Sequence, residues 1–405
     1  MKILHGIFLF YLQLIFIYSQ NSLTFQSNYD NCYSITINID PCNWRVILDT
    51  MNSYFILYDN FESSHPWAQR IINESTNITK GKNYTVKNYI NNIKVTEYYS
   101  SIKFKVFAHE LEQFYYYYTT SQCQDRKVWS TVDPNIRQLS LGLGLDVEQK
   151  KYSFVYSLYD NNIINKSVFS FKHALNERNK KIKYIHFGEV DNKIKNTYSH
   201  SFVSSIPFEQ NMWGIYISYI SIGNKITPIK SFANINSGIQ ENIRSFMIYK
   251  IFKEFLLEDS QYKDKCKEYN LKNDIITIVC DDIPKDQFNE EITFIVNNKI
   301  EFNIKLKTFF TWSGNTCKLS GIYFDSNDKD YELQVGQGFL EMFDLIEFNF
   351  EQRDITFFSK DIIFKESKSK NKINNDKQIV FILLISIMGI CNFCLLIYIK
   401  RKVVN

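Results

Sequence analysis

This chain of 405 residues has few histidines, few glycines and almost no excess of charge, and each shortage excludes a class of function. Its six histidines are scattered, and none is spaced from a cysteine or a second histidine as metal ligands are, so we expect no metal site. Gly142 and Gly144 lack the third glycine and the strand–helix context of a dinucleotide-binding loop, so we expect no cofactor. A net charge of +4, with basic residues clustered only near the C-terminus, gives no reason to expect a nucleic-acid partner.

Aromatic and β-branched residues are abundant instead. The chain has 34 phenylalanines and 27 tyrosines, and such residues favour strands. Alternating runs such as 33–39 and 292–296 predict strands with one buried face. The best helical candidate is 241–258. Four of its apolar residues are spaced to share one face: Ile243, Phe246, Ile251 and Phe255. The length allows two hydrophobic cores, and we expect an all-β protein.

Two short segments carry the strongest signal for function. Each is an apolar run typical of a strand, followed by a short polar residue, a hydroxyl residue and a turn: Val46-Ile-Leu-Asp49-Thr-Met-Asn-Ser53 and Phe232-Ala-Asn-Ile-Asn236-Ser-Gly238. Side by side they resemble the paired Asp-Thr/Ser-Gly loops of pepsin-like aspartic proteases, in which each lobe contributes one loop. Further segments resemble that family in the same order along the chain: 141–144, 167–171, 185–191, 213–223, 333–340, 348–350 and 355–358.

The resemblance implies a bilobal all-β fold with a central cleft, an N-terminal lobe over 21–205 and a C-terminal lobe over 206–364. It places Asp49 and Asn236 together at the cleft floor. In this family two carboxylates share one proton, so that one can accept a proton from water while the other holds the substrate carbonyl. Asn236 carries an amide, which has no proton to exchange near neutral pH. The second catalytic position is therefore degenerate.

The resemblance also assigns the residues that support the two loops. Thr50 and Ser53 match the hydroxyl residues that brace the first loop, and Ser237 and Gly238 complete the second. Met51 stands where the family has glycine, and we expect its side chain to crowd the Asp49–Asn236 pair or to displace the loop.

The family closes a hairpin with Tyr and Gly over its cleft. The corresponding stretch, 91–114, has Tyr98 and Tyr99 but no glycine, and both tyrosines are better interpreted as ordinary strand aromatics.

Two functions follow. The first is a membrane-anchored aspartic peptidase homologue, a pseudoenzyme that binds an extended peptide or protein in its cleft as a monomer. The second is an active aspartic-type endopeptidase with an unorthodox pair. A carboxylate at position 236 would favour the enzyme, and the amide of Asn236 favours the binding protein.

The two ends of the chain predict a membrane protein of the secretory pathway. Residues 1–20 have the layout of a signal peptide. After a polar stalk over 365–378, residues 379–399 form an uncharged run long enough to cross a bilayer as a helix. Lys400-Arg-Lys402 then predicts that the tail, 400–405, lies in the cytosol. We expect a single-pass type I protein of the cell surface or an endomembrane.

Six cysteines precede the predicted membrane helix, which suits an oxidising compartment. The resemblance places Cys280 and Cys317 at the family's second-lobe disulfide. Cys32 and Cys42 flank a predicted strand and are candidates to pair, which would leave Cys123 with Cys266. Six cysteines allow 15 pairings, so the partners of these four stay open. Four sequons are candidate glycosylation sites: Asn73, Asn77, Asn83 and Asn165.

Overall fold

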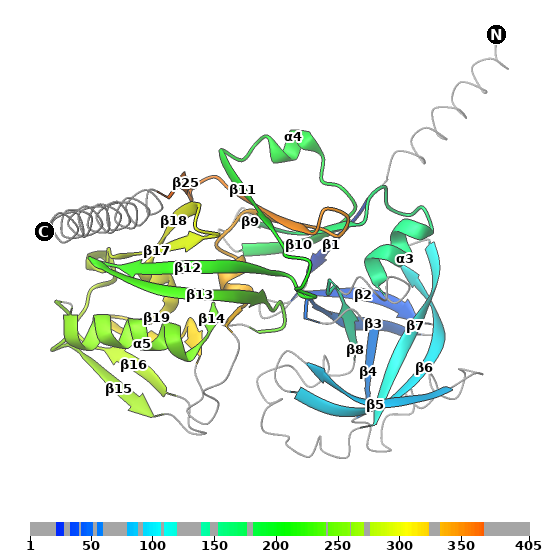
Figure 1. Cartoon of the computed structure of the whole chain (residues 1–405), viewed down its shortest axis with the longest axis horizontal. Coiled ribbons are helices and arrows are strands. Elements are labelled where there is room, and N and C mark those ends of the chain that lie inside the picture. Colours follow the sequence, from blue (N-terminus) through cyan, green and yellow to red (C-terminus); the bar gives the residue numbers. More distant parts are fainter. Residues whose placement is uncertain are drawn as a thin grey trace, which may run out of the picture.

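The computed structural model describes residues 22–27, 33–39, 42–51, 55–59, 79–87, 92–106, 109–119, 139–145, 153–175, 181–239, 242–259, 261–270, 276–323 and 333–367. Most of these residues lie in strands of four sheets (Figure 1), which confirms the expected all-β class. The expected signal peptide, membrane helix and cytosolic tail lie outside the described residues. No helix among the described residues is long and apolar enough to cross a membrane.

The first half of the chain forms a seven-stranded sheet in the order β2-β3-β8-β4-β7-β6-β5. Its strands are β2 (Ser34–Ile39), β3 (Cys42–Asp49), β4 (Phe55–Asp59), β5 (Thr79–Lys87), β6 (Asn92–Val106), β7 (His109–Thr119) and β8 (Leu139–Gly142). Strand β2 confirms the run predicted at 33–39. Tyr98 and Tyr99 lie on β6, which pairs with β7 as a long hairpin.

The second half forms an eight-stranded sheet in the order β21-β14-β22-β13-β12-β17-β18-β25. Its strands are β12 (Gly214–Ile222), β13 (Lys225–Ile235), β14 (Ile243–Arg244), β17 (Glu291–Val296), β18 (Ile300–Lys305), β21 (Ile322–Tyr323), β22 (Gln334–Val335) and β25 (Lys365–Glu366). Strand β17 confirms the run predicted at 292–296. The polar stalk was expected to begin at residue 365, but there the chain still pairs with β18.

A four-stranded sheet, β15-β16-β20-β19, completes this half of the chain. Its strands are β15 (Cys266–Asn270), β16 (Ile276–Cys280), β19 (Phe310–Ser313) and β20 (Thr316–Leu319). A π-helical turn over Phe255–Asp259 precedes β15 in the chain. Two 3-10 turns, over Lys285–Gln287 and Leu306–Phe309, lie between β16 and β19.

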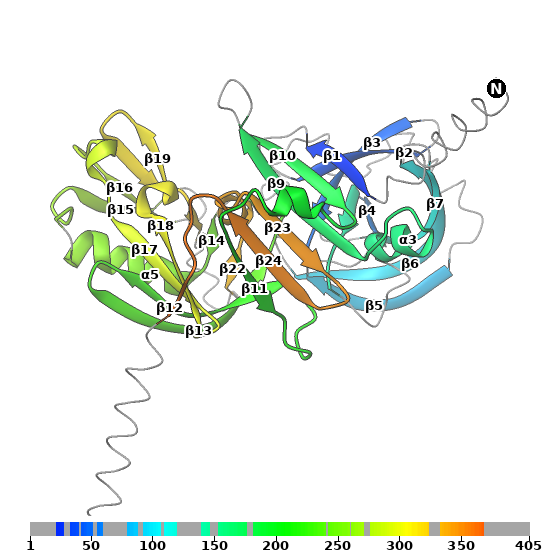
Figure 2. The same ribbon diagram turned by 90° about the horizontal axis from the view of Figure 1, so that it is seen from above.

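A six-stranded sheet takes strands from the start, middle and end of the chain, in the order β1-β10-β9-β23-β24-β11. These are β1 (Leu23–Ser27), β9 (Val168–Leu175), β10 (Lys181–Phe187), β11 (His200–Ser205), β23 (Leu345–Asn349) and β24 (Asp354–Ser359). Figure 2 shows this sheet between the seven-stranded and eight-stranded sheets. It therefore joins the two halves of the chain.

Aromatic side chains fill the core beside this joining sheet. Phe169 of β9 stacks on Phe348 of β23 with ring centroids 4.5 Å apart, and the fully buried Trp213 packs edge-on against Phe348. The Trp213 indole N–H donates to the carbonyl of Leu143 at 2.6 Å, so its one polar group is satisfied. Each such ring contributes about 1.5–3 kcal/mol by leaving water.

The described residues form four short helices: α3 (Phe154–Asp160), α4 (Asn192–Lys195), α5 (Phe246–Glu254) and α6 (Gln337–Leu340). The helix predicted at 241–258 is α5, but its expected apolar face is wrong. Ile243 belongs to strand β14, and Phe246 is 39% exposed. The Ser245 side chain accepts the Ile248 N–H and starts the helix there, which turns a different set of residues inward. The buried face consists of Ile248, Tyr249, Ile251 and Phe252.

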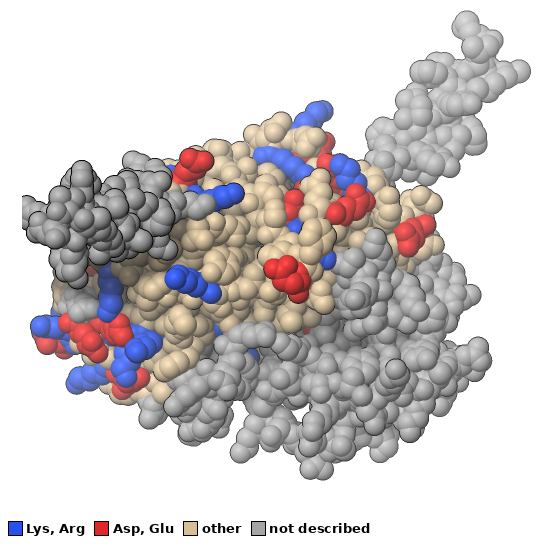
Figure 3. Space-filling model, viewed as in Figure 1, with Lys and Arg blue, Asp and Glu red and all other residues tan. Residues whose placement is uncertain are grey.

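Ion pairs fix the outer face of α5 to its neighbours. Glu254 accepts from Lys225 of β13 at 2.6 Å, and Lys253 pairs with Glu268 of β15. Figure 3 shows acidic and basic side chains gathered together at this end of the molecule. Helix α5 thereby contacts both the eight-stranded and the four-stranded sheet.

Candidate functional site

The two predicted loops follow strands in the same local arrangement. Strand β8 lies between β3 and β4, parallel to β3 and antiparallel to β4. Strand β22 lies in the same way between β13 and β14, parallel to β13 and antiparallel to β14. Asp49 is the last residue of β3, and Asn236 directly follows β13. The two halves of the chain thus repeat one three-stranded unit, and each unit ends in one candidate loop.

Two hydroxyl groups lock the loops together through reciprocal hydrogen bonds. Thr50 Oγ1 donates to the Ile235 carbonyl, and Ser237 Oγ donates to the Leu48 carbonyl, both at 2.7 Å. In return, the Thr50 N–H donates to Ser237 Oγ at 3.1 Å, and the Ser237 N–H donates to Thr50 Oγ1 at 3.0 Å. Both hydroxyl residues are fully buried. Each loop is therefore held by the other.

This lock brings Asp49 and Asn236 to equivalent positions, one residue before Thr50 and Ser237. Both residues are fully buried. Asp49 Oδ1 accepts the Met51 N–H at 2.8 Å, and Asn236 Oδ1 accepts the Gly238 N–H at 3.0 Å. The structure therefore gathers the site residues expected from the sequence, except Ser53, which lies outside the described residues.

Met51 fits the first loop without displacing it. Its side chain is buried, and its N–H makes the bond that Gly238 makes in the second loop. Neither Met51 nor Gly238 is among the described residues with a positive φ, so the backbone does not require glycine at this position. The expected displacement of the first loop is not seen.

Gln334 contacts the site but was not found from the sequence. The Asn236 side-chain Nδ2 donates to Gln334 Oε1 at 3.1 Å, and both residues are buried. Gln334 begins β22, and its backbone pairs with Asn234, two residues before Asn236. This contact fixes the direction of the Asn236 amide, with its nitrogen toward Gln334 and its oxygen toward Gly238. An amide inside the apolar run 333–335 was the only signal in the sequence.

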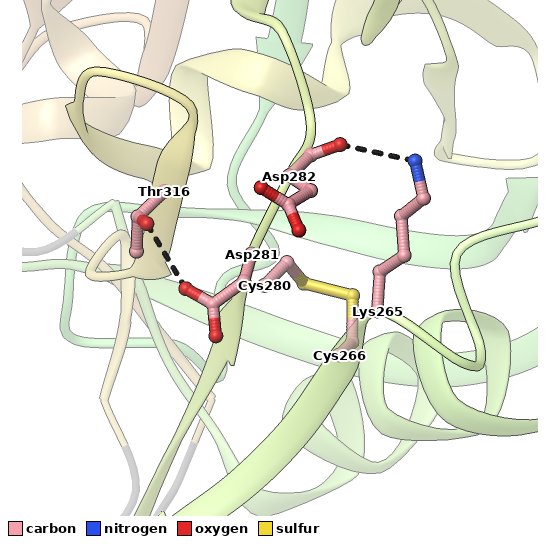
Figure 4. The surroundings of a disulfide bond; sticks show 6 residues. All are labelled: Lys265, Cys266, Cys280, Asp281, Asp282 and Thr316. Carbon is pink, nitrogen blue, oxygen red and sulfur yellow. Dashed lines mark hydrogen bonds between the residues drawn. A yellow bond between two sulfur atoms is a disulfide. The ribbon is translucent and has the colours of Figure 1, made fainter.

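The predicted disulfide between Cys280 and Cys317 is wrong. Cys317 is a buried free thiol. Cys280 bonds to Cys266, with a Cα–Cα distance of 4.0 Å (Figure 4). This also excludes the suggested Cys123–Cys266 pair. Strand pairing explains the error, because Cys280 lies directly opposite Cys266 on one side and Cys317 on the other. Sequence spacing could not decide between Cys266 and Cys317, because both lie directly opposite Cys280 on adjacent strands. Cys32 lies outside the described residues.

The four candidate glycosylation sites fall in different places. Asn165 is exposed before β9, where its Oδ1 accepts the Glu189 N–H at 3.2 Å. Asn83 lies on β5. Asn73 and Asn77 lie outside the described residues. Among the described residues, no three His, Cys, Asp or Glu side chains are grouped so that they could hold a metal ion.

A second buried polar network lies where the six-stranded sheet meets the start of β2. His173 Nδ1 contacts the Phe343 carbonyl and His173 Nε2 contacts the Tyr33 hydroxyl, both at 2.6 Å. A carbonyl can only accept, so Nδ1 carries the proton and Nε2 accepts from Tyr33. Burial lowers the pKa of His173 from 6.5 to about 4, although the Phe343 carbonyl opposes the shift. Nearby, the buried Lys183 pairs with Glu341 at 2.8 Å.

No protein-family model matches the chain, and no curated protein matches it. The function must therefore be inferred from the geometry of the two loops.

Proposed function

We propose that this protein is a divergent pepsin-like aspartic peptidase homologue that has lost catalysis. In this proposal its lobes, 21–205 and 206–364, bind an extended peptide or protein between them as a monomer. Residues 379–399 anchor it as a single-pass type I protein in a membrane of the secretory pathway. The observation that carries the proposal is the reciprocal lock between Thr50 and Ser237. It joins two repeated units and sets Asp49 and Asn236 in equivalent positions.

The chemistry of the pair argues against peptide hydrolysis. An aspartic peptidase needs one carboxylate to take a proton from water and a second acid to protonate the substrate. Asp49 can serve in the first role. Asn236 cannot serve in the second, because a carboxamide has no acidic proton near neutral pH and its nitrogen already donates to Gln334. Loss of one member of such a catalytic unit typically costs several orders of magnitude in rate.

The residual alternative is an active endopeptidase with an unorthodox pair. The undisturbed first loop favours it, because Asp49 keeps its bond to the Met51 N–H. In that case Asp49 alone would act as the base, and a group from the substrate or another residue would have to supply the proton.

A cleavage assay decides between the two. We would purify the proposed ectodomain, residues 21–364, and incubate it with a mixed peptide library between pH 3 and 7, with and without a statine-type inhibitor. Products are followed by mass spectrometry. We expect no inhibitor-sensitive cleavage, and the same background from the Asp49→Ala variant. Cleavage by the natural chain that Asp49→Ala abolishes would refute the non-catalytic proposal. The binding role would be supported if the ectodomain retained peptides and if bulky substitutions beside the Asp49 and Asn236 loops reduced this retention.

A further inference from the structure

Three cysteines lie in one row across three neighbouring strands of the four-stranded sheet. Cys266 of β15 is opposite Cys280 of β16, and Cys280 is opposite Cys317 of β20. All three are buried, with exposures of 4%, 0% and 0%. Residues directly opposite in paired strands point to the same face. The free thiol of Cys317 therefore stands beside the disulfide between the other two.

Cys280 can reach either neighbour. Residues directly opposite in antiparallel strands have Cα atoms about 4.5–5.5 Å apart, which lies within the range that a disulfide allows. The two pairings use the same sheet register, so neither requires a strand to slip. Pairing with Cys266 links β16 to the edge strand β15, and pairing with Cys317 would link β16 to β20.

We propose that these three residues form a thiol–disulfide exchange site in which Cys280 alternates between Cys266 and Cys317. The Cys317 thiolate attacks Cys280 Sγ, a Cys280–Cys317 bond forms, and the Cys266–Cys280 bond breaks. Cys266 leaves as a thiolate and takes up a proton equivalent to the one that Cys317 lost. One disulfide and one thiol are present before and after, so the step needs no oxidant or reductant.

The environment of Cys317 makes the exchange slow in the closed sheet. Burial raises the pKa of the Cys317 thiol to about 11, and the Asp281 carboxylate adds to the shift, against a backbone hydrogen bond to Cys280. The thiol is therefore protonated at neutral pH and is a poor nucleophile. Exchange has to wait for local opening of the strands or for a small thiol from solution.

The exchange would change what holds β15. At present β15 has the disulfide, its backbone pairing with β16, and the bond from Lys265 Nζ to the Asp282 carbonyl at 3.0 Å (Figure 4). On the other side, Thr316 Oγ1 donates to Asp281 Oδ1 at 2.9 Å and braces β16 against β20. After exchange β15 would keep only its noncovalent bonds.

Loosening β15 would affect α5. Glu268 of β15 accepts from the Tyr249 hydroxyl at 2.8 Å and pairs with Lys253, and both partners belong to α5. The cysteine pairing would thus set how firmly the four-stranded sheet holds α5.

The test maps disulfides in the full-length protein. The protein is incubated in a glutathione redox buffer at neutral pH, quenched with acid, labelled with N-ethylmaleimide and digested without reduction. Mass spectrometry then identifies linked and labelled peptides over time. We expect Cys266–Cys280 and Cys280–Cys317 linkages in the same sample, with the second increasing over minutes to hours. The label should lie on Cys317 in the first species and on Cys266 in the second.

Two variants control the interpretation. Cys317→Ser should keep only the Cys266–Cys280 linkage under the same buffer. Cys266→Ser should form the Cys280–Cys317 linkage, and circular dichroism establishes that this variant is folded. If Cys266→Ser does not fold, the time course of the natural protein decides the question. A single unchanging linkage of Cys280, to either partner, would overturn the proposal, and so would a stable bond between Cys317 and Cys123.

Discussion

Acidification should destabilise this protein through one buried histidine. His173 is protonated in the unfolded chain below about pH 6.5 but stays neutral in the folded protein down to about pH 4. Between these values the unfolded state binds the extra proton, so the free energy of unfolding falls as the pH falls. The difference between these two pKa values corresponds to about 3 kcal/mol of unfolding free energy, and this contribution is lost by about pH 4. Because Tyr33 contacts His173, the loss affects the joint between β2 and the six-stranded sheet.

The matched variant is His173→Gln, which keeps a polar side chain but cannot be protonated. We expect it to lower stability at pH 7, because at least one of the two 2.6 Å contacts is lost. It should also flatten the dependence of stability on pH between 6.5 and 4.5. The assay is urea unfolding of the purified protein at half-unit steps of pH, followed by tryptophan fluorescence.

Other groups titrate nearby, and the comparison between variant and natural protein separates them. Burial also lowers the pKa of His186, but that contribution is present in both proteins. Burial opposes ionisation of Glu341, yet Lys183 holds the Glu341 pKa below its ordinary value. The stability that this carboxylate provides is therefore lost only as the pH falls below about 4.5. An equal slope in both proteins between pH 6.5 and 4.5 would refute the role of His173.

Three further predictions concern the locked loops. Thr50→Val keeps the shape of the side chain but removes the acceptor of the Ser237 N–H, and should lower the unfolding free energy by about 1–3 kcal/mol in urea titrations. The same variant should also deamidate faster at Asn236, as measured by peptide mapping. The reason is that the Ser237 nitrogen, which Thr50 otherwise holds, is the atom that attacks the Asn236 side-chain carbonyl in deamidation. Gln334→Leu removes the acceptor of Asn236 Nδ2 and should cost about 1–3 kcal/mol, and an unchanged melting temperature would argue against that contact. Asn236→Asp should restore a carboxylate pair and show weak acid cleavage in the peptide assay. Because Met51 makes the same N–H bond as Gly238, adding Met51→Gly should change this rate little; cleavage by the double variant alone would mean that the Met51 side chain obstructs the site.

Local patterns in the sequence predicted the strands and both loops, because alternation and loop residues act within a few positions. The run at 33–39 became β2, and the hydroxyl residues Thr50 and Ser237 are the residues that join the loops. Contacts between distant segments were not predictable in this way. The partner of Cys280 depended on which of two opposite strands supplied it. Gln334 lies 98 positions from Asn236, and a single amide in an apolar run gave no direction for its contact.

The lock and the chemistry of this site use different atoms, and this separation explains how the proposed loss of catalysis is compatible with an intact loop pair. The lock uses two hydroxyls, two backbone carbonyls and two backbone N–H groups, none of which transfers a proton. Proton transfer would use only the side chains at positions 49 and 236. Two carboxylates close together in a buried site repel each other unless they share a proton. An amide at position 236 removes that repulsion and satisfies the Gly238 N–H and Gln334 at once. At neutral pH two aspartates at these positions would have no proton to share and would repel each other. Asn236 avoids this repulsion, so it fits a site that stabilises the joined loops at neutral pH.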